Sequence, residues 1–569
     1  MKRHLMLSVL ALAAAVAASA ELSAQEIPRE RIEDAIREGC ERIMQTQRDD
    51  GALILDERRM GPEGYYVYPV GTVSLGVLAL QHAVPHLRGE TATRARESIR
   101  KGLAWLAQHP LDPKTYSAGL IISVLHKQDP KKYHKLIGLY AAMLVLSQQP
   151  DGRDVGSYGY DLHLPPGYRL RENEETERRT TLGQADHSNA QFAVLGLLFA
   201  QRSGYQIPKR TWRMLRKHYI DVQNADGGWG YRPGRSRSDS YANMTLASTI
   251  SLAIAEEMLF AGEHKECKPP PESRPVDKGL RWVGDNLDYR RLETYGFYAV
   301  ERLGILSGYS DFGGKPWLES GTSLLVANRS WPAHGEGGRN QQVGAAFAVL
   351  FLSRGLEPVI INKLKRRGTN DWNNHLHDIR HLVEYISEKF QREKQWRIVT
   401  LDVPVDYLLK VPILWISGHE KLDFNAEEKA KLKEYVERGG TILGEACCSR
   451  KTFDGSFREL MKELWPDSEL RTVPKTHEIY NMPRRLRNYT VPVMQLWNTV
   501  NNTSIGVLYL PRGISCEWER GGTKARLPFD LGTNIFFYVD KIASKRVPQP
   551  AAVTVPEDGQ PGGGEGAAP

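Results

Sequence analysis

Two kinds of helical segment alternate along the first 356 residues. One kind is amphipathic and charged on one side, and the other is rich in Ala, Gly, Ser and Leu and apolar almost all round. The amphipathic segments are predicted at 31–47, 93–108, 131–147, 209–223, 276–287 and 317–328. The apolar segments are predicted at 72–83, 116–127, 188–200, 243–259, 295–307 and 340–354. Because an all-apolar helix must be buried among other helices, six such pairs predict a closed ring with the apolar set innermost.

A short turn motif, Q-x-x-D-G, recurs between these segments at 47–51, 148–152 and 223–227. Its glycine can adopt positive φ, so the chain can reverse sharply after a helix. The amide of Gln223 is placed to hydrogen-bond the exposed ends of neighbouring helices. Trp229, which follows the third turn, is large enough to fill the space between two hairpins.

These turns, together with KGLAW at 101–105 and KGLRW at 278–282, resemble the Q-W repeats of squalene–hopene cyclases. The resemblance covers residues 30–356 and implies the α/α toroid of terpenoid cyclases and protein prenyltransferases. The activity motifs of those families differ here. Where the cyclases have D-x-D-D, this chain reads DHSN from Asp186 and DSYA from Asp239. The prenyltransferase zinc set cannot be placed, because no cysteine occurs between Cys267 and Cys447.

Polar residues still gather where the apolar segments begin. They are predicted to orient an apolar or extended ligand (a lipid, isoprenoid, glycan or peptide) at a mouth of the ring. The proposed contacts are Asp186, His187, Asn189, Asp239, Asn243, His334 and Glu336. The alternative is that Asp and Asn at these positions only cap helices. No spacing supports a metal shared by His187 and His334, so no metal and no cofactor are expected.

After residue 356 the pattern changes to alternating strands and helices. A basic linker is expected at 357–370, before strands at 396–403, 411–417, 441–446, 493–497 and 505–510. Helices are expected between and around them at 376–390, 426–437, 456–464 and 532–542. Apolar strands that alternate with helices predict an α/β domain with a largely parallel sheet.

Four pieces of this half carry a second resemblance: VPILWISGHEKLDFNAEEKAKLKEYVERGGTILGEACC at 411–448, FDGSFRELMKELWP at 453–466, THEIY at 476–480 and LPFDLGTNIFFYV at 527–539. They resemble an uncharacterised bacterial domain family related in fold to class I glutamine amidotransferases and ThuA-like proteins. The resemblance implies a flavodoxin-like α/β domain at 371–544. The expected fold class is therefore multidomain, with an all-α six-hairpin α/α toroid at 26–356 followed by that domain.

The amidotransferase resemblance points to Cys447 as a nucleophile and His477 as its base. The elbow pattern G-x-C-x-G is not met, however, and Glu478 directly follows His477. The alternative is a small cysteine that packs behind a strand, so Cys447→Ala is expected to leave activity or binding intact. His377 and His381 would share a helix face, but no Glu stands between them in the catalytic position of a helical zinc site, so an exposed helix surface is expected.

Composition and the two ends of the chain set the context. Lys2 and Arg3 precede an apolar run at 5–18 and the small-residue site Ala18–Ala20, which predicts a signal peptide at 1–20 and an exported, periplasmic or secreted protein. That run is short for a membrane span. The Pro/Gly-rich stretch at 545–569 predicts a disordered tail.

Charge and cysteine content narrow the choice of function. The formal net charge is +8, but the basic residues are scattered, so no nucleic acid is expected as a partner. The five cysteines include no C-x-x-C pair and resemble no zinc module, and their disulfide pairing cannot be assigned. The first hypothesis is an exported binding or assembly protein whose α/β domain binds a protein partner. The rival is an enzyme, either a divergent terpenoid cyclase or prenyltransferase or an amidotransferase-like hydrolase.

Overall fold

A computed structural model describes most of the chain. The described residues are 27–54, 68–109, 111–164, 184–232, 239–260, 267, 274–332, 341–487, 491–497, 505–521 and 526–543. The expected signal peptide at 1–20, the tail at 545–569, His334 and Glu336 lie outside these residues. None of the described helices is long and apolar enough to cross a membrane.

The amino-terminal half is helical, and its helices fall into the two predicted sets. The apolar set, called here the central helices, consists of α3 (Pro69–Ala83), α5 (Thr115–Gln128), α7 (His187–Arg202), α9 (Ala242–Phe260), α11 (Thr294–Ser307) and α13 (Gln341–Gly355). The amphipathic set, called the peripheral helices, consists of α2 (Arg29–Met44), α4 (Gly89–Gln108), α6 (His134–Leu146), α8 (Lys209–Asp221), α10 (Pro275–Asn286) and α12 (Trp317–Ala327).

The central helices contact one another in chain order, from α3 through α5, α7, α9 and α11 to α13, and α13 in turn contacts α3. The peripheral helices α2, α6, α8 and α12 each also contact the central helix that follows them, whereas α4 packs on α3 and α10 on α9. The central helices are buried on nearly all sides, which explains why their sequences lack a polar face.

The Q-x-x-D-G turns join neighbouring hairpins through their glutamine side chains. The Nε2 of Gln47 donates to the carbonyl of Gly51 and to that of Ser98 in α4. The Nε2 of Gln223 donates to the carbonyl of Gly227, at 2.8 Å, and to that of Pro275 in α10, at 2.9 Å. The predicted role of Gln223 is therefore confirmed.

The KGLRW segment explains how two hairpins approach each other closely. A Cβ added to Gly279 would lie 2.4 Å from the Oγ1 of Thr249 and 2.8 Å from the ring of Trp229. Trp229 is fully buried, and its Nε1 donates to the carbonyl of Tyr219. Trp229 therefore fills the space between hairpins, as predicted.

The carboxyl-terminal half is an α/β domain. Its described strands form one seven-stranded sheet in the order β4-β3-β5-β6-β9-β8-β7. The bounds are β3 (Val359–Leu364), β4 (Gln395–Val399), β5 (Ile413–Gly418), β6 (Thr441–Ala446), β7 (Arg471–Thr472), β8 (Met494–Trp497) and β9 (Ile505–Leu510). The first five strands in this order pair in parallel. The strand β8 pairs antiparallel with β9, and β7 pairs antiparallel with β8. A separate two-stranded hairpin, β1 (Asp311–Phe312) and β2 (Lys315–Pro316), lies between α11 and α12.

Helices cover both faces of this sheet. One apolar cluster joins Ile413 and Trp415 of β5 to the first set of helices, and another joins Leu414 and Ile416 to the second set, as the alternation of side chains along a strand requires. The first set is α14 (Asp378–Phe390), α18 (Glu478–Asn481), α19 (Ser515–Arg520) and α20 (Arg526–Ala543). The second set is α15 (Val405–Leu409), α16 (Ala426–Glu437) and α17 (Lys451–Leu464).

The segment expected as a basic linker is instead part of the sheet. Residues 359–364 form β3, which lies between β4 and β5. Lys363 is buried because its Nζ donates to Asp378 at 2.6 Å and to the carbonyl of His375. Arg366 pairs with Asp371 at 2.6 Å. The basic residues suggested a solvated linker, but two of them are neutralised by carboxylates that follow later in the chain.

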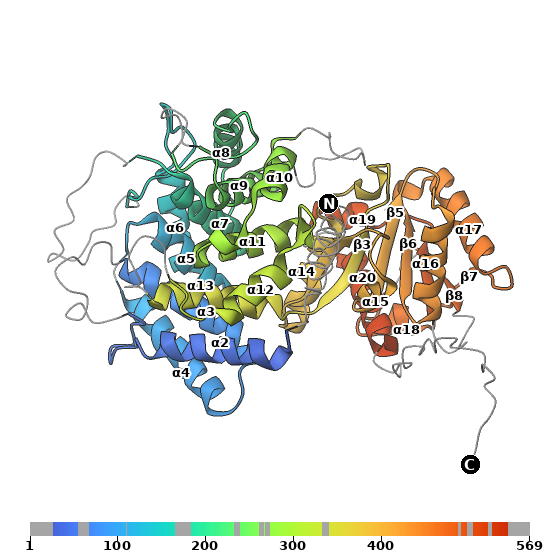
Figure 1. The fold of residues 1–569 in the computed structure, drawn as a ribbon, viewed down its shortest axis with the longest axis horizontal. Helices are drawn as coiled ribbons and strands as arrows, with labels where there is room; N and C mark the ends of the chain where they lie inside the picture. Colours follow the sequence, from blue (N-terminus) through green and yellow to red (C-terminus); the bar gives the residue numbers. More distant parts are fainter. Residues whose placement is uncertain are drawn as a thin grey trace, which may run out of the picture.

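The two halves meet at the carboxyl-terminal ends of the central helices (Figure 1). Each of these ends contacts the segment between α14 and β4 or a neighbouring part of the α/β domain. The contacts pair His82, Lys127 and Arg354 with Glu393, Arg202 with Glu384, Glu257 with Arg380, and the carbonyl of Gly308 with the amide of Ile398. The α/β domain therefore covers the end of the helical half at which the central helices have their carboxyl termini.

Candidate metal centre

The carboxyl ends of the parallel strands define one edge of the sheet. Numbered along the chain, the five parallel strands lie in the order 2-1-3-4-5. In such a sheet the chain leaves β3 and β5 toward opposite faces, and a crevice forms outside their carboxyl ends, where ligands of α/β proteins bind. This edge is therefore the place in the α/β domain where a functional site is expected.

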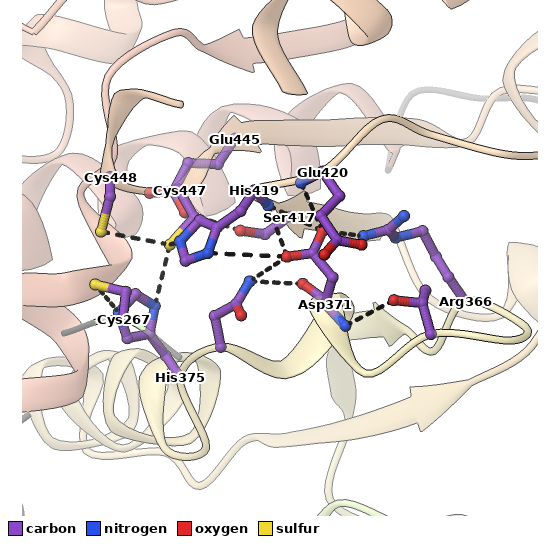
Figure 2. Close-up of polar contacts among 12 residues, drawn as sticks. Cys267, Arg366, Asp371, His375, Ser417, His419, Glu420, Glu445, Cys447 and Cys448 are labelled. Carbon is purple, nitrogen blue, oxygen red and sulfur yellow. Dashed lines mark hydrogen bonds and ion pairs between the residues drawn. The ribbon is translucent and has the colours of Figure 1, made fainter. Parts of the chain in front are cut away.

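Five ligand-type residues follow these strands. His375 comes after β3, His419 directly after β5, Cys447 and Cys448 directly after β6, and Cys516 lies in α19 after β9. A sixth residue, Cys267, comes from the helical half, between α9 and α10. The segments are distant in sequence but converge on one point, with Cys267, His375, His419 and the Cys447–Cys448 pair drawn together in Figure 2.

The ligand atoms form two overlapping groups. The first consists of Cys267, His375, Cys447 and Cys516, and the second of Cys267, His419, Cys447 and Cys448. Within each group all four ligand atoms lie within 4.8 Å of one another.

Individual separations are shorter still. The Nε2 of His375 lies 3.0 Å from the Sγ of Cys267, and the Nε2 of His419 lies 3.1 Å from the Sγ of Cys447. The Sγ of Cys516 lies 3.2 Å from that of Cys267 and 3.4 Å from that of Cys448. The Sγ atoms of Cys447 and Cys448 are 3.9 Å apart.

The backbone that presents Cys448 is strained. Cys448 and Ser449 both have positive φ, 51° and 57°. Such angles cost a residue other than glycine about 1–3 kcal/mol, and they concentrate at functional sites. Gly513 allows the α19 segment to approach this turn, because a Cβ there would lie 2.6 Å from the amide nitrogen of Cys448.

A buried carboxylate orients the loop that carries His419. Asp371 accepts hydrogen bonds from the amides of His419 and Glu420, each at 2.9 Å, and from Asn374 and Arg366. The Nδ1 of His419 lies 3.9 Å from the same carboxylate (Figure 2). Burial opposes ionisation of Asp371, but the hydrogen bonds outweigh it and hold its pKa below the usual value.

A second carboxylate, that of Glu445, is linked to His375 by hydrogen bonds through Ser515. The Nδ1 of His375 lies 3.1 Å from the Oγ of Ser515, and that hydroxyl donates to Glu445 at 2.5 Å. Glu445 also accepts from the hydroxyl of Ser417 and is completely buried. His419 thus presents Nε2 to Cys447, and His375 presents Nε2 to Cys267, while each Nδ1 lies on the side of a carboxylate network, as in metal-ligating imidazoles. The Nδ1 of His375 also lies 3.7 Å from the Sγ of Cys447.

The protonation equilibria show how strongly these groups interact. Burial would lower the pKa of His375, but hydrogen bonds to Cys267 and Cys516 raise it to about 11. A hydrogen bond from Cys447 lowers the pKa of Cys448 to about 6, and one from Cys447 also lowers that of Cys267. Hydrogen bonds to Cys267, Cys448 and Cys516 raise the pKa of Cys447. Thiolate character is thus favoured at Cys267 and Cys448 and disfavoured at Cys447, and thiolate is the form that binds metals.

The donor set fits zinc or a similar soft transition metal. Tetrahedral zinc with Zn–S bonds of about 2.3 Å places its sulfur ligands about 3.8 Å apart. The sulfur separations of 3.2–3.9 Å are close to this value. Thiolates and imidazoles select zinc, copper or iron–sulfur chemistry and disfavour magnesium or calcium.

The structure separates the two residues of the expected amidotransferase pair. Cys447 lies beside His419 and His375. His477 caps α18, where its Nδ1 accepts from the amide of Ile479, and its ring contacts Tyr538. The alternative that Cys447 only packs behind a strand does not account for its contacts with the imidazoles of His419 and His375.

His377 and His381 do not lie on an exposed helix surface, contrary to expectation. His377 bonds Glu519 at 2.8 Å. His381 lies 3.2 Å from Glu257 of the helical half and 2.8 Å from the carbonyl of Trp518. These residues hold α14 between α9 and α19, so they contribute to the domain contact.

The expected ligand contacts of the helical half are dispersed. Asp186 caps α7, accepting from the amide and the side chain of Asn189 at 2.8 Å. His187 is buried between α7 and α8, with its Nδ1 2.6 Å from the carbonyl of Gly230. Asp239 is exposed. These placements match helix capping and wall packing, and the ligand site stays a prediction.

Aromatic side chains also cross the space between the central helices. The ring of Phe192 in α7 lies 6.2 Å from those of Tyr295 and Tyr298 in α11, although α9 separates these helices in the order of contacts. Tyr298 in turn lies 5.2 Å from Phe347 of α13. Side chains therefore occupy the middle of the helical half at this level.

The sequence did contain a signal for the candidate metal ligands, in the positions of the strand ends. His419 and Cys447 each directly follow a strand that was predicted correctly at its carboxyl end or within one residue of it. Since the carboxyl ends of parallel strands meet at one edge, these residues had to lie near one another. No comparable signal exists for Cys267, which lies in a different half of the chain.

Comparison with known families covers the second half only. Residues 361–539 match a family model described as a domain of unknown function (DUF4159). His375, His419, Cys447, Cys448 and Cys516 lie inside the matched region, and Cys267 lies outside it. A search of curated proteins found no match.

Proposed function

We propose that this protein binds transition-metal ions at the carboxyl edge of its sheet, and that the bound metal fastens the helical half to the α/β domain. One observation carries the proposal: thiol and imidazole ligand atoms from separate segments lie within 4.8 Å of one another in two overlapping groups. Metal-ligand types that converge from distant parts of a chain are the signature of a metal site, because packing alone gives no reason to gather them.

Two further features support a metal. His419 and His375 present Nε2 to Cys447 and Cys267. Asp371 and the Ser515–Glu445 pair lie on the Nδ1 side of these imidazoles. The thiols are not joined by disulfide bonds. Zinc is the best candidate, because mixed cysteine and histidine ligands in a tetrahedral set are typical of structural zinc sites.

The proposed structural role follows from the origin of the ligands. Cys267 belongs to the helical half and the others to the α/β domain. A metal that binds both would add to the ion pairs between Glu257 and Arg380 and between Arg202 and Glu384. Because metal binding free energy in such sites contributes directly to folding, the centre would stabilise this arrangement of the domains.

We also propose that the helical half is an α/α toroid of the terpenoid cyclase and prenyltransferase type, and that the α/β domain is flavodoxin-like. The return of contacts from α13 to α3 and the strand order 2-1-3-4-5 support these assignments. In this proposal the toroid is a scaffold, and the aromatic contacts between Phe192 and α11 favour that role over a large ligand cavity. The amino-terminal pattern supports export, where metal ligation would protect the thiols from oxidation.

Metal analysis of the purified protein tests the metal-binding function. The wild type should retain zinc through extensive dialysis, as measured by inductively coupled plasma mass spectrometry, and Cys447→Ala should lose it. Cys40→Ala is the matched control, because Cys40 is a buried cysteine in α2 outside both ligand groups. Metal-free wild-type protein that takes up no zinc, or a Cys267–Cys516 disulfide found by non-reducing peptide mapping, would overturn the proposal.

A further inference from the structure

The two ligand groups at the carboxyl edge overlap in a specific way. They share Cys267 and Cys447, and they differ in their remaining pair, which is His375 with Cys516 in one group and His419 with Cys448 in the other. Each group thus contains one histidine and one cysteine of its own, so the six ligand side chains divide into two equal sets around a common pair.

Two ions that share two ligands would explain this overlap. One tetrahedral ion uses four ligands, and a single ion here would leave two of the six ligand side chains unused. Two tetrahedra that share an edge need six ligands, two of which bridge both ions. A thiolate sulfur can bridge because it has several lone pairs, whereas an imidazole nitrogen has only one. Both shared residues are cysteines, which are the ligands in the set that are able to bridge.

The separations agree with this division. His375 and Cys516 lie 3.0 Å and 3.2 Å from the shared Cys267. His419 and Cys448 lie 3.1 Å and 3.9 Å from the shared Cys447. Each unshared ligand therefore neighbours a shared sulfur, as the outer ligands of an edge-sharing pair of tetrahedra must. The Sγ atoms of Cys516 and Cys448, which complete different ions in this division, lie only 3.4 Å apart, so these two side chains must move apart when both ions bind.

The net charge of the six ligands also favours two ions. Four thiolates and two neutral imidazoles carry four negative charges, which two divalent ions neutralise. A single divalent ion bound by either group, which has three cysteines and one histidine, would leave one negative charge in a site where Cys447 and His375 are buried, and the fourth cysteine would stay an unused thiol.

Resting on the proposed metal-binding function, we infer that the site holds two divalent zinc-type ions bridged by the thiolates of Cys267 and Cys447. His375 and Cys516 complete one ion, and His419 and Cys448 complete the other. On binding, each of the four thiols releases its proton and each histidine binds as neutral imidazole through Nε2. Both ions depend on Cys267, so neither tetrahedron is complete unless the helical half contributes this residue.

The test is the number of ions per chain, measured in variants of bridging and terminal ligands. Wild-type protein should contain two zinc ions per chain, and titration of metal-free protein with Co²⁺ should saturate its thiolate-to-cobalt absorption at two equivalents. Cys516→Ala and Cys448→Ala should each retain one ion. Cys267→Ala and Cys447→Ala should retain neither, because each removes a ligand from both tetrahedra. Cys40→Ala should retain two.

The outcomes separate this inference from the function on which it rests. One ion per wild-type chain overturns the binuclear centre but leaves metal binding intact, and no ion overturns both. Two ions in the wild type with one retained in Cys447→Ala overturns the bridging assignment. Because wild-type stoichiometry decides between one ion and two, the test holds even if a variant fails to fold, which circular dichroism would reveal.

Discussion

Buried polar side chains gather both at the amino end of α7 and at the carboxyl edge of the sheet, yet the two places differ in what those side chains face. At α7, Asp186 bonds Asn189, and His187 bonds a carbonyl in the adjoining wall. At the sheet edge, Cys447 faces two imidazoles and neighbouring sulfurs. The first group bonds mainly to the protein's own backbone and side chains, with the Oδ1 of Asn189 left without a partner among the described residues, whereas the second has the form of a coordination shell.

The two halves also differ in what stabilises them. The helical half is held by continuous packing, with tryptophans such as Trp229 and close approaches at glycines such as Gly279. The sheet edge gathers strained backbone at Cys448 and polar groups that packing alone would not favour. A site that costs stability in this way is expected to regain it when its ligand binds.

The largest expected effect tests the sheet edge. Chelation of the metal under reducing conditions should lower the free energy of unfolding by at least about 5 kcal/mol, because structural zinc binds with about 10–16 kcal/mol at neutral pH. For the transition of the α/β domain, whose size corresponds to a Tm shift of about 2–4 °C per kcal/mol, this is a fall in Tm on the order of 15 °C, measured by scanning calorimetry. The metal-free variant Cys447→Ala should not respond to chelator. An unchanged wild-type Tm would contradict the comparison, because the edge would then be stable without metal.

The next effect tests the helical half. Trp229→Ala should lower the free energy of unfolding by about 3–5 kcal/mol, since it removes a large, fully buried side chain and leaves a cavity between hairpins. The metal content per folded chain should not change. As a comparison, Trp497→Ala, at a position 40% exposed, should lower the free energy of unfolding less than Trp229→Ala does in denaturant titrations, because this side chain buries less area and its removal leaves no enclosed cavity. Loss of metal in folded Trp229→Ala would show that the two halves are more tightly coupled than proposed.

The smallest effect concerns the contact between the halves and depends on pH. Burial opposes ionisation of Glu393, but the charges of Arg354 and Lys127 hold its pKa well below the usual value. Burial, followed by the charge of Lys127, lowers the pKa of His82. Both groups bind protons more readily when unfolded, so their contribution is present at neutral pH and is lost on acidification, below about pH 6.5 for His82 and about pH 4.3 for Glu393.

Glu393→Gln in the metal-free Cys447→Ala background isolates this contribution. Its stability should fall less steeply between pH 5 and pH 3 than that of the parent, as measured by urea unfolding at each pH. Glu469→Gln, which changes an exposed carboxylate, is the matched control. Equal slopes for Glu393→Gln and its parent would show that Glu393 does not stabilise the domain contact.

Much of the architecture could be predicted from local patterns. The twelve helices of the described helical half lie within a few residues of their predicted positions, because apolar and amphipathic periodicity reports burial directly. The strands β5, β6 and β9 were predicted for the same reason. The strand β3 was missed, because Lys363 appears solvated until Asp378 is seen to pair with it.

The amino-acid sequence by itself determined the helix pairs, the glutamine turns and the alternation of strands and helices, since these depend on residues a few positions apart. The tertiary structure alone decided which polar residues form a site. Cys267 and Cys516 are separated by 249 positions, yet their sulfurs lie 3.2 Å apart. No local period encodes that proximity, because it depends on the strand order of the sheet and on the docking of the helical half against it.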